Sequence, residues 1–368
     1  MKYIFFVLIT IVNIFALSEF EPSQTCKGCH PIIYDEYLNS GHNNSSLSND
    51  KIHKAVWNIH PLKKKEKYTC SKCHSPSTLD EGVSCLSCHK IKDVEIHTRS
   101  NKNIMTKERK IFYSARQSER VNSKKSYKTQ TSWFGMFSGK SGSPFHDIDF
   151  SNDNYYNGNV CIGCHSHKQN SKKFDVCNMN IDTNKSNEKE NCITCHMPEV
   201  EGSFSNYKSS KKHRYHGFPG TIHKPQMLAK YLLFTLNKTD NGFDLIVENR
   251  ANHALLLHPL RVGELKINIY RDSKKIELPS IKFVRVIGKN SKPSMPWVAD
   301  EVLKDTQLKA KESRVFHFNK NLQNSDRVEV ILGHYIITQK PANKIGIKDR
   351  ELTKFKFFKS QIFTIEHE

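Results

Sequence analysis

Five short segments of the chain repeat a spacing of cysteine and histidine that can hold an iron porphyrin. Each reads Cys-x-x-Cys-His, and they comprise residues 26–30, 70–74, 85–89, 161–165 and 192–196, here called the first to fifth motifs. Two thiols one helical step apart can each form a thioether with a haem vinyl group, and this pattern is the attachment signature of c-type haem. The adjacent imidazole then binds the iron as its proximal ligand.

The motifs therefore predict five covalently attached haem c groups as cofactors. The thioether cysteines would be Cys26, Cys29, Cys70, Cys73, Cys85, Cys88, Cys161, Cys164, Cys192 and Cys195. The proximal ligands would be His30, His74, His89, His165 and His196. Zinc ribbons and thiol–disulfide oxidoreductases also use Cys-x-x-Cys pairs. Neither needs a histidine after every second cysteine, and 19 histidines among 368 residues would not place five there by chance.

The second axial position of each iron separates electron transfer from catalysis. Nineteen histidines less the five proximal ones leave fourteen candidates for it. The favoured distal ligands are His42, His97, His146 and His216. Weaker candidates are His53, His60, His167, His213 and His223, whereas His258, His317, His334 and His367 are expected to be structural or exposed. The second and third motifs are close in sequence, so we expect their haems to stack or nearly touch.

The elements that hold the motifs are expected to be short helices and loops in residues 19–225. Five haems within about 200 residues leave too little polypeptide for an ordinary aliphatic core, so the porphyrins would replace it. We expect a helix just after each motif, for example over residues 31–40. Residues 98–145 form a polar excursion near whose end lie Trp133, Phe134 and Phe137. This excursion is either a solvated insertion or a docking loop for a partner.

Residues 226–368 change to a strand pattern. Leu232–Leu236 and Phe243–Val247 flank Asn241-Gly242, which is a strong hairpin signal. Further strand-like segments cover residues 265–269, 281–287, 314–318, 328–337 and 355–365. About seven strands separated by turns predict an antiparallel, immunoglobulin-like β-sandwich. The predicted fold class is thus α+β with two domains, a haem-packed, mainly helical and loop cytochrome domain followed by the sandwich.

Residues 1–18 are predicted to be a signal peptide rather than part of the fold. Lys2 precedes an apolar run, and small residues around Ala16 and Ser18 suit a signal peptidase. An uncleaved anchor is the alternative. Export to the periplasm agrees with the motifs, because c-type haem is attached outside the bacterial cytoplasm. The remaining cysteine, Cys177, has no second spare cysteine for a disulfide, so we expect a buried apolar thiol.

The chain is strongly basic, with 57 Lys and Arg against 37 Asp and Glu and a net charge of +20. A basic protein raises the hypothesis of nucleic-acid binding. Export and haem argue against it. An acidic redox partner protein, an anionic membrane surface or a small anionic substrate agrees better with these features.

The motifs and their surroundings resemble a superfamily of multihaem c-type cytochromes. The resemblance lies in the spacing from Cys26 to His42, the close pair of motifs at residues 70–89, the segment at 192–198 and the His216-Gly217-Phe218-Pro219-Gly220 sequence. The superfamily includes tetrahaem electron-transfer cytochromes, pentahaem nitrite reductases and octahaem hydroxylamine oxidoreductases. It implies distal ligands at His42 and His216 and haems stacked in pairs. A loop of exported relatives with a C-terminal domain is similar to residues 249–261, which implies that His253 ligates a haem of the first domain.

Two functions follow from these expectations. The first is electron transport in a respiratory chain through closely spaced, mostly bis-His haems. The second is an oxidoreductase acting on nitrite, hydroxylamine or sulfite at one five-coordinate haem. Nitrite reductases of the superfamily mark their catalytic haem with Lys in place of the motif histidine, whereas all five motifs here end in His. In either case the sandwich could bind a quinol-oxidising membrane partner or a terminal reductase.

Overall fold

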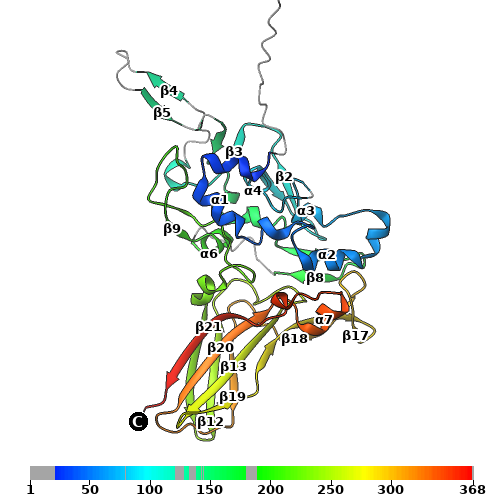
Figure 1. Ribbon diagram of the computed structural model, residues 1–368, viewed down its shortest axis with the longest axis vertical. Coiled ribbons are helices and arrows are strands. Elements are labelled where there is room, and N and C mark those ends of the chain that lie inside the picture. The colour runs from blue at the N-terminus through cyan, green and yellow to red at the C-terminus, as the bar shows by residue number, and fades with distance from the viewer. Residues whose placement is uncertain are drawn as a thin grey trace, which may run out of the picture.

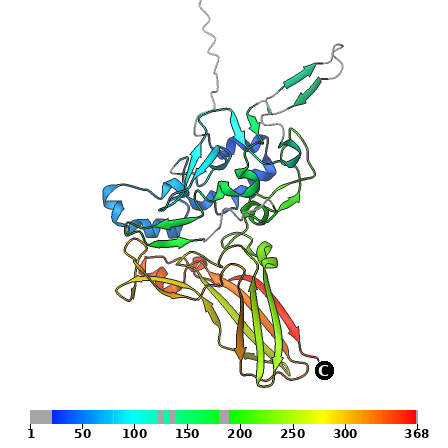
Figure 2. The ribbon, with the colours of Figure 1, turned by 180° about the vertical axis from the view of Figure 1, so that it is seen from behind.

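The computed structural model describes residues 21–78, 80–120, 143, 145–179 and 189–366, and the backbone alone of residues 128–131 and 138–141. The predicted signal peptide lies outside the described residues, as do Trp133, Phe134, Phe137 and His367. The motif-bearing segments gather at one end of the molecule, and the long strands after residue 231 gather at the other (Figures 1 and 2).

Short helices carry or flank the motifs. The α-helices before residue 226 are α1 (Pro31–Leu38), α2 (Lys51–Asn58), α3 (Ser71–His74), α4 (Cys85–His89), α5 (Asn154–Asn157) and α6 (Cys192–His196). The helix expected after the first motif is present as α1, with Pro31 at its first position, where proline costs no backbone hydrogen bond. After the other four motifs the prediction was wrong, because bends follow the second motif and strands follow the third, fourth and fifth, beginning with β1 (Ile91–Glu95) after the third. In α3, α4 and α6 the motif itself is the helix.

The start of two motif helices is fixed by side-chain capping. Ser84 and Asn191 each accept a hydrogen bond from a backbone amide inside α4 and α6 and form a capping box with Ser87 and Thr194. These boxes place both thiols of the motif on one short helical turn.

Two-stranded pairings complete the motif-bearing part. They join β1 to β2 (Lys102–Met105), β3 (Ile111–Tyr113) to β6 (Asp147–Asp149), β4 (Lys128–Thr131) to β5 (Ser138–Ser141), β7 (His167–Gln169) to β8 (Asp175–Asn178), and β9 (Glu199–Glu201) to β10 (Lys212–Arg214). The apolar cluster described in this part is small, with Ile111, Tyr113 and Tyr155 as its buried members. So little apolar contact cannot by itself hold together a domain of this length.

The strands after residue 231 form two larger sheets around one core. The first has the order β11 (Leu232–Thr239), β12 (Gly242–Asn249), β19 (Ser313–Phe318). The second has the order β14 (Lys274–Glu277), β13 (Val262–Arg271), β20 (Arg327–Tyr335), β21 (Lys356–Thr364), with β15 (Ile281–Phe283) paired to β13. Leu245 and Val247 of one sheet and Leu265, Ile269 and Val330 of the other have no exposed surface and belong to one cluster. A third sheet joins β16 (Arg285–Lys289), β17 (Lys292–Pro293) and β18 (Glu301–Asp305).

The predicted hairpin between β11 and β12 is confirmed, with a register shifted by one residue. Thr239 pairs with Gly242, so the two turn residues are Asp240 and Asn241. Gly242 begins β12 with φ +156°, and a Cβ there would lie 1.9 Å from the Phe318 carbonyl oxygen of β19. The glycine is therefore needed for close strand approach rather than for the turn itself.

An apolar contact joins α2 to the strand-rich part. Ile52, Ala55 and Val56 of α2 pack on the cluster that contains Ile337 and Ala342, the latter in α7 (Gln339–Lys344). Lys51 adds an ion pair to Asp349 at 2.6 Å. Among the described helices, none is both long and apolar enough to cross a membrane.

Candidate functional site

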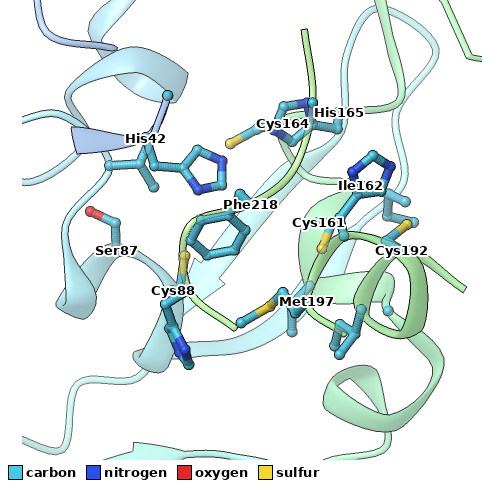
Figure 3. Close-up of a pocket in the computed structure, with 18 of the residues that line it drawn as sticks. His42, Ser87, Cys88, Cys161, Ile162, Cys164, His165, Cys192, Met197 and Phe218 are labelled. Atoms are coloured by element: carbon cyan, nitrogen blue, oxygen red, sulfur yellow. The ribbon is translucent and has the colours of Figure 1, made fainter. Parts of the chain in front are cut away.

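One continuous cavity runs through the motif-bearing part, with a volume of about 3480 Å³. Pockets for a single small ligand occupy roughly 300–1,000 Å³, so this one has room for several large groups. All five motifs line it, and so do residues 249–261 from the strand-rich part. Figure 3 shows side chains of the third, fourth and fifth motifs facing this space together with His42 and Phe218.

Backbone carbonyls fix the tautomer of three motif histidines. His30 Nδ1 lies 2.6 Å from the Phe204 oxygen, His89 Nδ1 2.7 Å from that of Tyr113, and His196 Nδ1 2.7 Å from that of Pro219. A carbonyl can only accept, so Nδ1 carries the proton in each ring. The lone pair is then on Nε2, which is the arrangement that a metal-ligating histidine needs.

Four motif histidines lie opposite a second imidazole at the spacing that an intervening iron requires. A metal–imidazole nitrogen bond is about 2.0 Å long, so two rings on opposite faces of one ion have centroids roughly 6 Å apart. The centroid separations are 6.4 Å for His30–His146, 5.9 Å for His165–His42, 6.3 Å for His89–His216 and 6.1 Å for His196–His253. These pairs unite four of the five distal residues expected from the sequence with four different motifs.

The second members of two pairs also have a fixed tautomer that leaves the lone pair on Nε2. His216 Nδ1 donates to the Arg214 oxygen at 2.6 Å, and His253 Nδ1 donates to that of Ala254 at 2.9 Å. The Nδ1 atoms of His42 and His146 are buried without a hydrogen-bond partner. His253 comes from the loop between β12 and β13, so the strand-rich part contributes directly to the cavity of the motif-bearing part.

Burial lowers the pKa of four of the imidazoles along the cavity because charge is costly away from water. The pKa falls to about 3 in His42 and His216 and to about 4 in His74 and His146, with nearby histidines adding to the effect. A metal needs the neutral ring. At neutral pH these side chains are therefore in the form that can ligate iron.

His97 is not brought to any motif, so the structure corrects the expectation that it is a distal ligand. Its side chain is 47% exposed, and Nε2 lies 3.2 Å from the Glu95 carboxylate. It does not line the cavity. It follows the third motif in sequence, with the strand β1 between them.

The weaker candidates have other partners. His213 uses both ring nitrogens, on the Gly202 oxygen and on Glu36 Oε1. His167 donates to the Thr98 oxygen, His223 bonds Tyr215, and His60 Nδ1 accepts from the Leu62 amide. His317 pairs with Asp244 and His334 with the Thr221 oxygen, in agreement with the structural roles expected for both. His258 is exposed, in agreement with the expectation that it is structural or exposed, and it lines the cavity, as His334 also does.

A buried ion pair supports His216 from the first motif's helix. Glu36 Oε1 lies 3.0 Å from His213 Nε2, and Glu36 Oε2 accepts from the His216 amide at 2.8 Å. The side chain of His213 is 1% exposed and that of Glu36 15%. Since α1 carries Glu36, the segment after the first motif positions the ring opposite His89. No feature of the sequence around Glu36 indicates this role.

Contacts between cysteines show which motifs are neighbours. Cys26 lies close enough to Cys85, Cys73 to Cys164, and Cys161 to Cys192 for each cysteine to shift the pKa of its neighbour's thiol. The first motif therefore lies beside the third, and the fourth lies between the second and the fifth. The expected contact of the second with the third motif is not among these thiol pairs.

The eleventh cysteine, Cys177, is partly buried in β8. Burial raises the pKa of its thiol, which is the direction expected of an inert apolar thiol. The sequence prediction for this residue agrees with that environment.

The fold is similar to that of a penta-haem cytochrome c552 from Thermochromatium tepidum, with a TM-score of 0.71. The match covers 94% of this chain and 99% of that one at 20% sequence identity, and this likeness concerns the fold. No protein-family model and no curated protein sequence matches the chain. The α+β arrangement of a motif-bearing part and a strand-rich part is thus one that a penta-haem cytochrome also adopts.

Proposed function

We propose that the chain is an exported penta-haem c-type cytochrome that carries electrons between respiratory partner proteins. The observation that carries the proposal is the set of four imidazole pairs spaced 5.9–6.4 Å apart, each containing a motif histidine. Bound haem would supply one-electron redox chemistry. The chain's own residues would hold each group by two cysteines and a motif histidine, and at four of the five motifs a second histidine would face the first.

The thiol contacts support a continuous route through the molecule. The cysteines of the fourth motif lie close to those of the second and of the fifth motif. The cysteines of the first and third motifs form a separate pair of neighbours. Cys88 of the third motif is close enough to raise the pKa of Cys161 and of Cys164 in the fourth. The two groups of neighbouring motifs thus meet between the third and fourth motifs, which suits a carrier in which each centre has a neighbour.

The partners of such a carrier are proposed to be acidic redox proteins in the periplasm. The net charge of +20 would draw an acidic donor or acceptor toward it. A quinol-oxidising membrane partner would dock on the strand-rich part. The signal peptide at residues 1–18, removed after export, accounts for the compartment.

Haem counting tests this proposal directly. Mass spectrometry of the exported, mature chain should find five added porphyrins, and replacement of both cysteines of one motif, Cys161→Ser with Cys164→Ser, should remove one. Cys177→Ser is the matched control and should retain all five. A mature wild-type chain without added porphyrin mass would refute the cytochrome and the electron route together.

A second candidate function has one observation in its favour. An oxidoreductase acting on a small nitrogen or sulfur species needs one iron with an open position. His74 of the second motif is the motif histidine that has no described imidazole 5.9–6.4 Å from it. This candidate function uses the same haem-binding residues as the electron carrier. It differs only in requiring an open iron position at the second motif.

A further inference from the structure

The second motif differs from the other four in what lies opposite its histidine. The described imidazole nearest to His74 is His53, with ring centroids 4.1 Å apart and planes at 53°. Two rings in direct contact leave no room for a metal between them, since each metal–nitrogen bond is about 2.0 Å long. His53 also has the Tyr68 hydroxyl 3.2 Å from Nε2. It is therefore placed beside His74 and not across an iron from it.

The loop between β12 and β13 supplies a different kind of imidazole to this region. The Leu260 amide donates to His258 Nδ1 at 3.2 Å. A backbone amide can only donate, so Nδ1 holds the lone pair and Nε2 holds the proton. His253 of the same loop has the opposite tautomer, because its Nδ1 donates to the Ala254 oxygen. The same loop thus carries two kinds of imidazole. His253 has its lone pair on Nε2 and faces His196 of the fifth motif, whereas His258 has an Nε2–H donor and lines the cavity.

A buried cation follows His258 by three residues. Arg261 lines the same cavity, and its Nη1 is buried without a hydrogen-bond partner. Asp50, which also lines the cavity, is the carboxylate whose charge acts on Arg261. A buried guanidinium nitrogen without an acceptor is costly, so it usually marks the place of an anion. Burial lowers the pKa of His258, and the charges of Arg261 and His74 add to that effect.

We infer that the haem of the second motif is open on the face opposite His74 and takes a small anion there, with His258 Nε2–H and Arg261 as the donors that hold it. This inference rests on the proposed haem content and names the motif at which an exogenous ligand would bind. Two sources could supply an anionic oxygen to Arg261, namely the free anion and a propionate of the haem itself. Both sources would provide an anionic oxygen that accepts a hydrogen bond from the Arg261 guanidinium.

The first arm of the test is the spin state of the purified protein after five haems have been counted. Paramagnetic resonance should show one high-spin and four low-spin ferric haems, and nitrite should convert the high-spin signal. His253→Ala should add a second high-spin haem, because His253 faces His196. His317→Ala removes an exposed histidine paired with Asp244 and should change nothing. Five low-spin haems in the wild type would overturn the inference while leaving the carrier intact.

The second arm separates the roles of the two histidines near His74. His258→Ala should leave the number of high-spin haems at one and weaken nitrite binding. His53→Ala should also leave that number at one, with nitrite affinity close to that of the wild type. A new high-spin haem in either variant would show that the replaced histidine is an iron ligand, which would contradict the open face.

The third arm decides between the two sources of the anion. Arg261→Gln should weaken nitrite binding by roughly tenfold or more, since a charge-assisted hydrogen bond is lost. Binding of carbon monoxide to the reduced protein should stay unchanged, because that ligand has no charge. Equal losses for both ligands, or a shifted midpoint potential with unchanged nitrite affinity, would place a propionate on Arg261 and refute its part in the anion site.

Discussion

The proton on each histidine distinguishes the chemistry of the residues around the cavity. His30, His89, His196, His216 and His253 donate from Nδ1 to a carbonyl, whereas His258 accepts there. The proximal residues are predictable from sequence, because five consecutive positions contain the whole binding unit. The distal residues are less so, since each lies far along the chain from the motif histidine that it faces, as His216 does from His89. The sequence favoured His97 over His258, whereas the fold leaves His97 outside the cavity and places His258 in its lining.

The Glu36–His213 pair gives a prediction at the residue scale. Glu36→Ala leaves a buried imidazole unpaired and frees the His216 amide, so it should cost about 3 kcal/mol of unfolding free energy. The haem between His89 and His216 should become partly high-spin, which paramagnetic resonance would detect. Asp35→Ala, next to it on the exposed face of α1, is the control. If both variants behave alike, Glu36 does not position His216.

His334 gives a pH prediction. Burial lowers its pKa to about 4, from an ordinary value near 6.5, and its ring is 2% exposed. The unfolded chain therefore binds a proton between pH 6.5 and 4 that the folded chain does not, so stability is full above pH 6.5 and falls as the pH decreases. Over this range the loss should be about 3 kcal/mol.

Denaturant unfolding at pH 7 and pH 4 measures this loss. His334→Gln, which can still donate to the Thr221 oxygen, should lose correspondingly less than the wild type over the same interval. Parallel curves for the two proteins would mean that His334 titrates normally in the fold.

At the scale of elements, prediction succeeded where side chains form the interior. The alternation of apolar residues in β12, β13 and β20 defines one buried face, and Leu245, Leu265 and Val330 lie on it. In residues 21–225 the expected helix recurred after one motif but not after the other four. The interior there is a cavity that the motifs line, so the chain has no apolar periodicity from which helix and strand positions could be inferred.

The hairpin of β11 and β12 gives a prediction at this scale. A Cβ on residue 242 would collide with the Phe318 carbonyl oxygen, and the φ of +156° disfavours any side chain. Gly242→Ala should therefore lower the unfolding free energy by about 2 kcal/mol or more. Gly220→Ala, whose added Cβ would make only an ordinary 3.7 Å contact, should cost much less. Thermal unfolding followed by circular dichroism compares the two.

At the scale of the whole molecule, the motifs are ordered by contact and not by position in the chain. The second motif touches the fourth through Cys73 and Cys164, although the third lies nearer in sequence. Sequence proximity failed as a guide here because residues 90–160, including the strands β1 to β3, separate the third motif from the fourth, which Cys88 nevertheless approaches. The split into a motif-bearing and a strand-rich part was readable from composition, whereas the junction at α2 and α7 was not.

Charge gives a prediction for the molecule as a whole. Lys63, Lys64 and Lys65 are exposed just before the second motif, which makes this region a proposed docking surface for an acidic partner. Replacing all three by Glu should slow reduction of an anionic acceptor protein about tenfold at low salt, and less as salt increases.

Stopped-flow rates against ionic strength would measure the effect. Lys238→Glu with Lys274→Glu, exposed on β11 and β14 of the strand-rich part, is the control. Equal slowing in both variants would indicate that net charge alone matters and that partners do not dock near the second motif.

The position of His253 has a consequence for how the protein is assembled. All ten thioether sulfurs precede it in the chain, and it faces His196 only after the β12–β13 loop has reached the cavity. A nascent polypeptide that emerges amino end first can thus be fully loaded with porphyrin while the fifth group still lacks one axial partner. Maturation would then finish when the strand-rich part packs on the motif-bearing part. A chain that ends before His253 would carry haem and be coloured, but its fifth haem would lack the second axial ligand.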